Sequence, residues 1–121
     1  MKGYKNESIT VIETDLKRCR ELKSLIDTEK DRDNDVLDTY KKLGGEGTLQ
    51  NATLDNLLQE RDKLINKYLL AIVNLKELEK VTIMAYYIDG CGIKQIAAEL
   101  RVQERQIVYA KKRALEKLLA Y

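Results

Sequence analysis

The sequence predicts an all-α fold, with an N-terminal antiparallel helical arm followed by a C-terminal domain of three short helices. The 121 residues include no proline, and the helix-favouring leucine, glutamate, lysine and alanine are abundant. Apolar residues recur at helical spacing through much of the chain. From residue 75 the pattern breaks into shorter segments separated by turn signals. We therefore expect an arm of residues 1–74, for oligomerisation, and a C-terminal domain of residues 75–121.

The first helix is predicted over residues 9–30. An apolar stripe follows helical spacing along it: Ile9, Ile12, Leu16, Cys19, Leu22, Leu25 and Ile26. Thr10 and Glu13 stand at the spacing of a capping box, and Ser8 is an alternative N-cap. A stripe this continuous predicts a partner helix.

Residues 27–51 are predicted to connect the first helix to the next. The first half continues the helix or begins the connection, and the second half must be a loop because it contains Gly44, Gly45 and Gly47. Alternate aspartates resemble the start of a calcium loop: Asp31, Asp33 and Asp35. However, Val36 replaces the required glycine and Lys42 replaces the bidentate glutamate. The segment "GGEGT" lacks the Lys-Ser/Thr of a phosphate-binding loop. We expect a solvated connection.

The second helix is predicted to start near Thr53, which is a plausible N-cap. Its stripe is wide and apolar except for Arg61: Leu54, Leu57, Leu58, Arg61, Leu64, Ile65, Tyr68, Leu69, Ile72 and Val73. One partner helix would not cover such a stripe. We expect the helix to pack antiparallel on the first and to use the remainder in a homodimer formed through the N-terminal helices.

Three short helices are predicted for the C-terminal domain. The first covers about 75–88 and ends at Asp89-Gly90, the second covers about 93–100, and the third starts at 103 or 104. One continuous helix through Ala97 and Leu100 would place apolar residues at 103 and 104, but these are Gln103 and Glu104. This break in phase favours two helices joined by a short turn, as in a helix-turn-helix unit.

A helix-turn-helix unit needs a small residue where its two helices meet, and Ala97 is that residue. Apolar side chains are expected to close the wedge around it: Ile96, Leu100, Val102, Ile107 and Ala110. The turn position at Arg101 often needs a left-handed backbone, which costs a residue with a Cβ about 1 kcal/mol. We expect Arg101 to accept this cost and to contact phosphate.

The charge distribution predicts an anionic partner for the C-terminal part. The net charge is +2, but residues 1–60 carry 10 basic and 13 acidic side chains, whereas residues 61–121 carry 12 basic and 7 acidic ones. The net charge is therefore −3 for residues 1–60 and +5 for residues 61–121. Such an asymmetry, in a chain with a helix-turn-helix pattern, indicates double-stranded DNA as the partner.

The segment "LKELEKVTIMAYYIDGCGIKQIAAELRVQERQIVYAKKRALEKL", residues 75–118, resembles the promoter-reading C-terminal domain of sigma-70-type factors, their region four. The matching features are "YYIDG", "IAAEL" and "ALEKL". The whole layout is similar to small phage and prophage regulators of the ArpU/RinA type. The resemblance implies that the opening turns of the third helix read the major groove: Glu104, Arg105, Val108, Tyr109 and Lys112. The sequence departs from the sigma pattern at Val108 and in the order of Glu104 and Arg105, so a typical −35 target is not predicted.

The residues themselves predict the same face. Ile107, Ala110 and Ala114 must point into the core, so the side chains between them point outward. Arg105 is suited to a guanine edge and Val108 to a thymine methyl group. The predicted DNA-binding residues are Lys94, Gln95, Arg101, Gln103, Glu104, Arg105, Val108, Tyr109, Lys111, Lys112 and Arg113. For Tyr109, burial at an interface is an equal alternative, and for Lys117 we expect a solvated helix face.

The sequence argues against an enzyme. Without histidine there is no histidine general base, and Cys19 and Cys91 do not have the spacing of a zinc or redox motif. We expect reduced thiols, no cofactor and no metal. The polar N-terminus and short apolar runs predict a cytoplasmic protein without a membrane partner.

Three functional classes remain open. The leading one is a sequence-specific transcriptional regulator from a phage or prophage, controlling late or packaging genes. The second is the small subunit of a phage terminase, which packages DNA. The third is a helical adaptor that binds RNA polymerase or a host regulator through "ERDKLINKYLLAIVNL".

Overall fold

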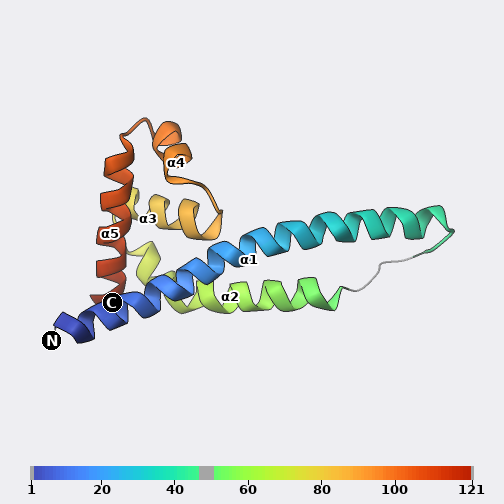
Figure 1. The fold of residues 1–121 in the computed structure, drawn as a ribbon, viewed down its shortest axis with the longest axis horizontal. Helices are drawn as coiled ribbons and strands as arrows, with labels where there is room; N and C mark the ends of the chain where they lie inside the picture. The colour runs from blue at the N-terminus through green and yellow to red at the C-terminus, as the bar shows by residue number, and fades with distance from the viewer. Residues whose placement is uncertain (1, 47–50, 121) are drawn as a thin grey trace.

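The computed structural model describes residues 2–46 and 51–120, and within these ranges the fold is all-α. The helices are α1 (Lys2–Lys42), α2 (Ala52–Val73), α3 (Glu77–Ile83), the π-helical η1 (Met84–Ile88), α4 (Ile93–Leu100) and α5 (Glu104–Ala120). Figure 1 shows α1 and α2 as a long antiparallel hairpin, with α3, α4 and α5 gathered near the end that holds the N-terminus.

α1 is longer than the predicted helix of residues 9–30. Both proposed caps, Ser8 and Thr10, lie inside it, because it already begins at Lys2. It continues to Lys42 because neither proline nor glycine interrupts the acidic segment, and it ends where Gly44 adopts a φ of 85°. The aspartates compared with a calcium loop therefore lie on a helix, where successive side chains diverge by about 100°. Gly47 lies outside the described residues.

α2 begins two residues earlier than Thr53 would place it, and Asn51 is its N-cap. The side-chain oxygen of Asn51 accepts a hydrogen bond from the Leu54 amide at 3.0 Å. Its amide nitrogen donates to Glu29 and Asp33 on α1, at 3.1 and 3.3 Å. Thr53 lies inside the first turn of α2. Its hydroxyl could accept one bond and donate one, whereas the Asn51 amide accepts one and donates two. The cap thus also fastens the start of α2 to α1.

The hairpin is held by a buried stripe on α1 and by polar pairs along its edge. The predicted stripe residues Ile12, Leu16, Cys19, Leu22 and Ile26 are buried, and Cys19 and Cys91 are free thiols. Leu25 is exposed instead, because it lies to one side of the stripe. Arg18 donates two hydrogen bonds to Glu60, and Asp15 accepts from both Lys67 and Tyr68.

α2 does leave part of its apolar stripe uncovered, as predicted. Tyr68, Ala71 and Ile72 are buried against the rest of the fold, whereas three large apolar side chains of α2 are exposed: Leu69, Leu70 and Val73.

One core cluster joins the arm to the C-terminal helices. It takes residues from both sides of position 74: Ile12, Leu16, Tyr68, Ala71, Ile72, Leu75, Ile83, Tyr87, Ala114, Leu115 and Leu118. A second cluster, of Ile96, Ala97 and Ile107, lies between α4 and α5. The predicted boundary at residue 74 therefore does not coincide with a break in the packing.

The helix predicted at 75–88 is divided into two parts. α3 starts at Glu77, after the N-cap Lys76, and changes at Met84 into the π-helical η1. The Asp89 amide donates to the Met84 carbonyl at 3.0 Å, which is the i to i+5 bond of a π-helix. The predicted turn at Asp89-Gly90 is confirmed, with a φ of 77° at Gly90.

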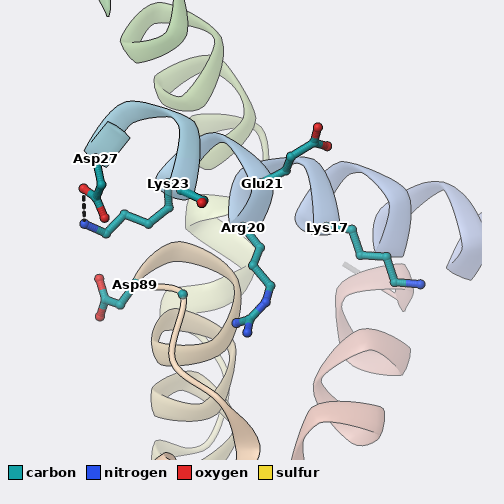
Figure 2. Close-up of a pocket in the computed structure, with 8 residues that line it drawn as sticks. Lys17, Arg20, Glu21, Lys23, Asp27 and Asp89 are labelled. Carbon is teal, nitrogen blue, oxygen red and sulfur yellow. Dashed lines mark hydrogen bonds and ion pairs between the residues drawn. The ribbon is translucent and has the colours of Figure 1, made fainter. Parts of the chain in front are cut away.

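Two arginines of the arm hold the chain where η1 ends. Arg20 donates to the carbonyls of Tyr86 and Cys91, at 2.5 and 2.8 Å, and Arg61 donates to the carbonyl of Ile88 at 3.2 Å. Figure 2 shows Arg20 reaching from α1 toward the segment that contains Asp89. The Tyr86 and Ile88 carbonyls lie in the last turn of η1, at the negative end of the helix dipole, so guanidinium donors stabilise them. A hollow of about 550 Å³ beside Arg20 is lined by charges of both signs.

Lys117 is exposed, as the sequence predicted, but its ammonium also forms an ion pair with a buried carboxylate. Its Nζ donates to both oxygens of the buried Glu79, at 2.7 and 3.0 Å. Burial alone would raise the pKa of Glu79, but the bonds from Lys117 and from the Lys76 amide outweigh it and lower that pKa below 4.5. The ionised pair thus joins α3 to α5. It could not be predicted because its residues lie 38 positions apart.

Lys117→Met is expected to lower the free energy of unfolding at pH 7 by about 2 kcal/mol, because it leaves a buried carboxylate without its cation. Since the folded pKa of Glu79 lies below its unfolded value, the pair contributes stability above pH 4.5 that is lost as the pH falls further. Urea denaturation at pH 7 and pH 3 should therefore show a smaller acid loss in the variant. Lys112→Met, on an exposed position of the same helix, is the control.

Candidate nucleic-acid interface

The turn between α4 and α5 has the left-handed residue that the sequence predicted. Arg101 has φ 57° and ψ 43°, and it is the one non-glycine residue with positive φ among those described. The Val102 amide donates to the Ala97 carbonyl at 3.0 Å, and the Arg101 amide donates to the Ala98 carbonyl at 3.3 Å. These two bonds form a Schellman motif, which ends α4 and turns the chain sharply.

The contact between α4 and α5 is small and apolar. Ile96, Ala97 and Ile107 are buried together, and Val102 packs against them. Leu100 was expected in this wedge, but it is 37% exposed. The Schellman turn explains the difference, since it folds Val102 back over Ala97 and leaves Leu100 on the outer side.

The start of α5 is fixed by its own side chains. The Gln103 amide donates to Oε1 of Gln106 at 2.9 Å, which satisfies a backbone donor at the helix start. The Arg105 guanidinium lies 3.5 Å from Oε1 of Gln103. Arg101 and Arg105 line a shallow hollow of about 530 Å³ at this end of α5. Two guanidinium groups next to a helix N-terminus make the local field favourable for an anion.

The two faces of α5 are divided as predicted. Ile107, Ala110 and Ala114 are buried. Val108 is 49% exposed and Tyr109 is 52% exposed. The predicted groove-facing residues on this side are all exposed: Glu104, Arg105, Val108, Tyr109 and Lys112, with Arg113 beside them. Tyr109 is therefore not buried within the chain.

Three further predicted DNA-binding residues have different surroundings. Lys94 and Gln95 are exposed in the first turn of α4, and the Gln95 amide donates to Glu99 at 3.3 Å. Lys111 is half-buried, and its Nζ lies 4.5 Å from the centroid of the Tyr86 ring. The ring thus attracts the Lys111 ammonium toward η1 and away from the exposed row.

Sequence reasoning missed the contribution of the arm to this region. The Arg20 guanidinium lies 4.1 Å from the centroid of the Tyr86 ring, and Lys111 contacts the same ring, so Tyr86 links α1 to α5. Arg61 appeared in the sequence only as a polar interruption of an apolar stripe. That interruption was the one available signal, because a charged residue on a buried helix face needs a partner.

No known protein family, curated protein or solved structure matches the chain. Within residues 2–46 and 51–120, no helix combines the length and apolar content that a membrane crossing requires. The same residues include no group of three histidine, cysteine or acidic side chains placed to hold a metal ion.

Arg101→Gly is expected to stabilise the fold and to weaken DNA binding. Glycine adopts the left-handed turn without steric cost, so the free energy of unfolding should rise by up to about 1 kcal/mol. The lost guanidinium should reduce affinity for duplex DNA of any sequence. Thermal unfolding and fluorescence anisotropy measure the two effects on one sample. A fall in both would show that the arginine side chain stabilises the turn.

Proposed function

We propose that this protein is a sequence-specific regulator of transcription that binds double-stranded DNA as a homodimer. The α4–turn–α5 unit acts as a helix-turn-helix, with the first turns of α5 in the major groove and the arm joining the two copies. The observation that carries the proposal is the exposed row of Arg105, Val108, Tyr109 and Lys112 on a helix whose opposite face is buried.

The chemistry of this row is suited to a DNA groove. A major groove about 12 Å wide accepts an α-helix, an arginine pairs with guanine in bidentate fashion, and an apolar side chain contacts a thymine methyl group. Lys112 and Arg113 extend the row with positive charges for the phosphate backbone. In Figure 1 the start of α5 lies far from α2, so the arm does not obstruct it.

A dimer supports this function because one such unit makes few contacts. A single small module buries only about 600–1,000 Å² on DNA, and selective binding usually requires two. The resemblance to sigma-type domains and phage regulators favours control of transcription over DNA packaging. The same proposal includes RNA polymerase as a second partner.

Fluorescence anisotropy with random duplex DNA tests the electrostatic part. Affinity should fall steeply with salt, with a logarithmic slope of about −0.9 for each phosphate neutralised. Lys112→Ala should weaken binding to all sequences and reduce the slope by about one. Lys63→Ala, an exposed lysine on α2, should change neither. A salt-independent affinity would contradict the proposal.

Selection of bound fragments from a random DNA library tests the sequence-specific part. We expect a two-fold symmetric motif. Arg105→Ala should then reduce the preference for that motif over random DNA by roughly tenfold or more, because one bidentate base contact is lost. Enrichment of no motif would contradict sequence-specific reading.

A further inference from the structure

The far end of α1 carries an apolar surface that no other described helix covers. Val36 is 49% exposed and Leu43 is 83% exposed, with Thr39 between them. A shallow hollow of about 420 Å³ runs along this surface, lined by Asp35, Val36, Thr39, Tyr40 and Leu43. Figure 1 shows that α1 continues past the start of α2, so this segment projects from the fold.

This surface differs from the stripe that packs on α2. Val36 and Leu43 are seven residues apart and lie on one side of α1. The buried stripe, which includes Leu22 and Ile26, lies on a neighbouring side. Glu29 and Asp33 accept hydrogen bonds from the cap Asn51, and Val36 borders a hollow that the start of α2 also lines. Beyond them Tyr40 turns back on its own segment, where its hydroxyl donates to the Glu46 carbonyl at 2.8 Å.

The charges beside the surface are ordered in a way that suits an antiparallel copy of the same helix. Asp35 and Lys42 are seven residues apart, so they lie on the same flank of Val36 and Leu43. When two identical helices pack antiparallel with Thr39 on the two-fold axis, Val36 of one lies within one residue step, about 1.5 Å along the axis, of the level of Leu43 of the other. Asp35 and Lys42 are offset by the same step in the opposite sense, and two-fold symmetry repeats each pair.

A shifted register loses this complementarity. Moving the axis toward the N-terminus by five residues brings Leu25 opposite Leu43, but it also places Asp31 and Asp35 of the two copies near each other. Like charges across helix flanks are unfavourable, whereas opposite charges set orientation and register. Of these two registers, the one centred on Thr39 pairs apolar with apolar and acidic with basic side chains.

We propose that residues 35–43, at the end of α1 and one residue beyond it, dock on the same segment of a second copy, antiparallel and centred on Thr39. The two hairpins then meet at their far ends, and the two α4–turn–α5 units lie at opposite ends of the assembly. This inference specifies the interface of the dimer in the proposed function, and it is tested without DNA. The exposed Leu69, Leu70 and Val73 on α2 are the competing surface.

Sedimentation of the full chain over a range of concentrations tests the interface. We expect a monomer–dimer equilibrium. Asp35→Lys and Lys42→Asp should each weaken the dimer by roughly tenfold, because each change turns two attractive pairs into two repulsive ones. The double variant, Asp35→Lys with Lys42→Asp, should restore dimerisation. Glu116→Lys is the control, since it changes the charge equally on an exposed position of α5, away from the surface.

The outcomes separate this inference from the proposed function. Rescue by the double variant cannot arise from misfolding, and circular dichroism should show equal helicity for all variants. A monomer at every concentration, a ring of eight or more subunits, or dissociation by Leu70→Asp but not by the charge variants would each overturn the inference. Anisotropy with duplex DNA is then read separately: a dimer that follows the charge pattern but binds no DNA would overturn the proposed function alone.

Discussion

Replacing Tyr87 with alanine is expected to lower the free energy of unfolding by about 3–5 kcal/mol. Tyr87 is 0% exposed and lies in the cluster that joins the arm to the C-terminal helices. Its ring packs edge-on against Tyr86, with centroids 4.8 Å apart and planes at 88°. Loss of the ring would leave a cavity where α1, η1 and α5 converge. The packing of α1 on the C-terminal helices and the packing of α5 would then both weaken.

The matched change Tyr87→Phe should act in the opposite direction. The Tyr87 hydroxyl is buried, and no residue in the described part of the chain gives it a hydrogen bond. Burial accordingly raises the pKa of this phenol far above 10. Because a buried hydroxyl without a partner is costly, its removal should raise the free energy of unfolding by about 1 kcal/mol. Urea denaturation of the three proteins measures both effects, and a destabilised phenylalanine variant would show that the hydroxyl is satisfied in solution.

The fold class could be predicted from the sequence because periodicity is local. The stripe through Ile12 and Ile26, the turn at Gly90 and the phase break after Leu100 each depend on residues a few positions apart. The predicted length of α1 was too short for a related reason. Polar, acidic sequence has no apolar stripe to mark it, yet nothing in it stops a helix before the glycines at Gly44 and Gly45.

In the candidate site, the sequence predicts which side chains are buried and which are exposed, because these positions depend on residues close together in the chain. The inward Ile107 and Ala110, the exposed Val108 and the left-handed Arg101 all follow from positions on α4, the turn and α5. Leu100 was misplaced because the hydrogen bonds of the turn, rather than helical phase, decide which side chain covers Ala97.

Contacts between distant segments could not be predicted at all. Arg20 donates hydrogen bonds to carbonyls 66 and 71 residues away, and Glu79 on α3 pairs with Lys117 on α5. A charged residue shows in the sequence that it needs a partner, but not which one. The arm therefore looked like a separate unit in the sequence, although its arginines fix the segment that carries α4.

Replacing Ala97 with leucine is expected to destabilise the fold by about 3 kcal/mol. Ala97 is buried between Ile96 and Ile107, and its carbonyl accepts the Val102 bond that ends α4. Three added carbons would push the two helices apart at their closest contact, since helix propensity itself barely differs between alanine and leucine. Thermal and urea unfolding measure the loss.

The neighbouring Ala98 provides a matched control, because it is exposed on the same helix. Ala98→Leu should change stability by no more than about 0.5 kcal/mol. DNA binding should separate the variants in a second way. If the contact with α4 sets the angle at which α5 enters the groove, Ala97→Leu should lose its preference for the selected motif. It should still bind random DNA in a salt-dependent way, because its basic side chains remain. Retention of full sequence preference by a folded Ala97→Leu protein would contradict the role of the α4–α5 contact in presenting the reading face.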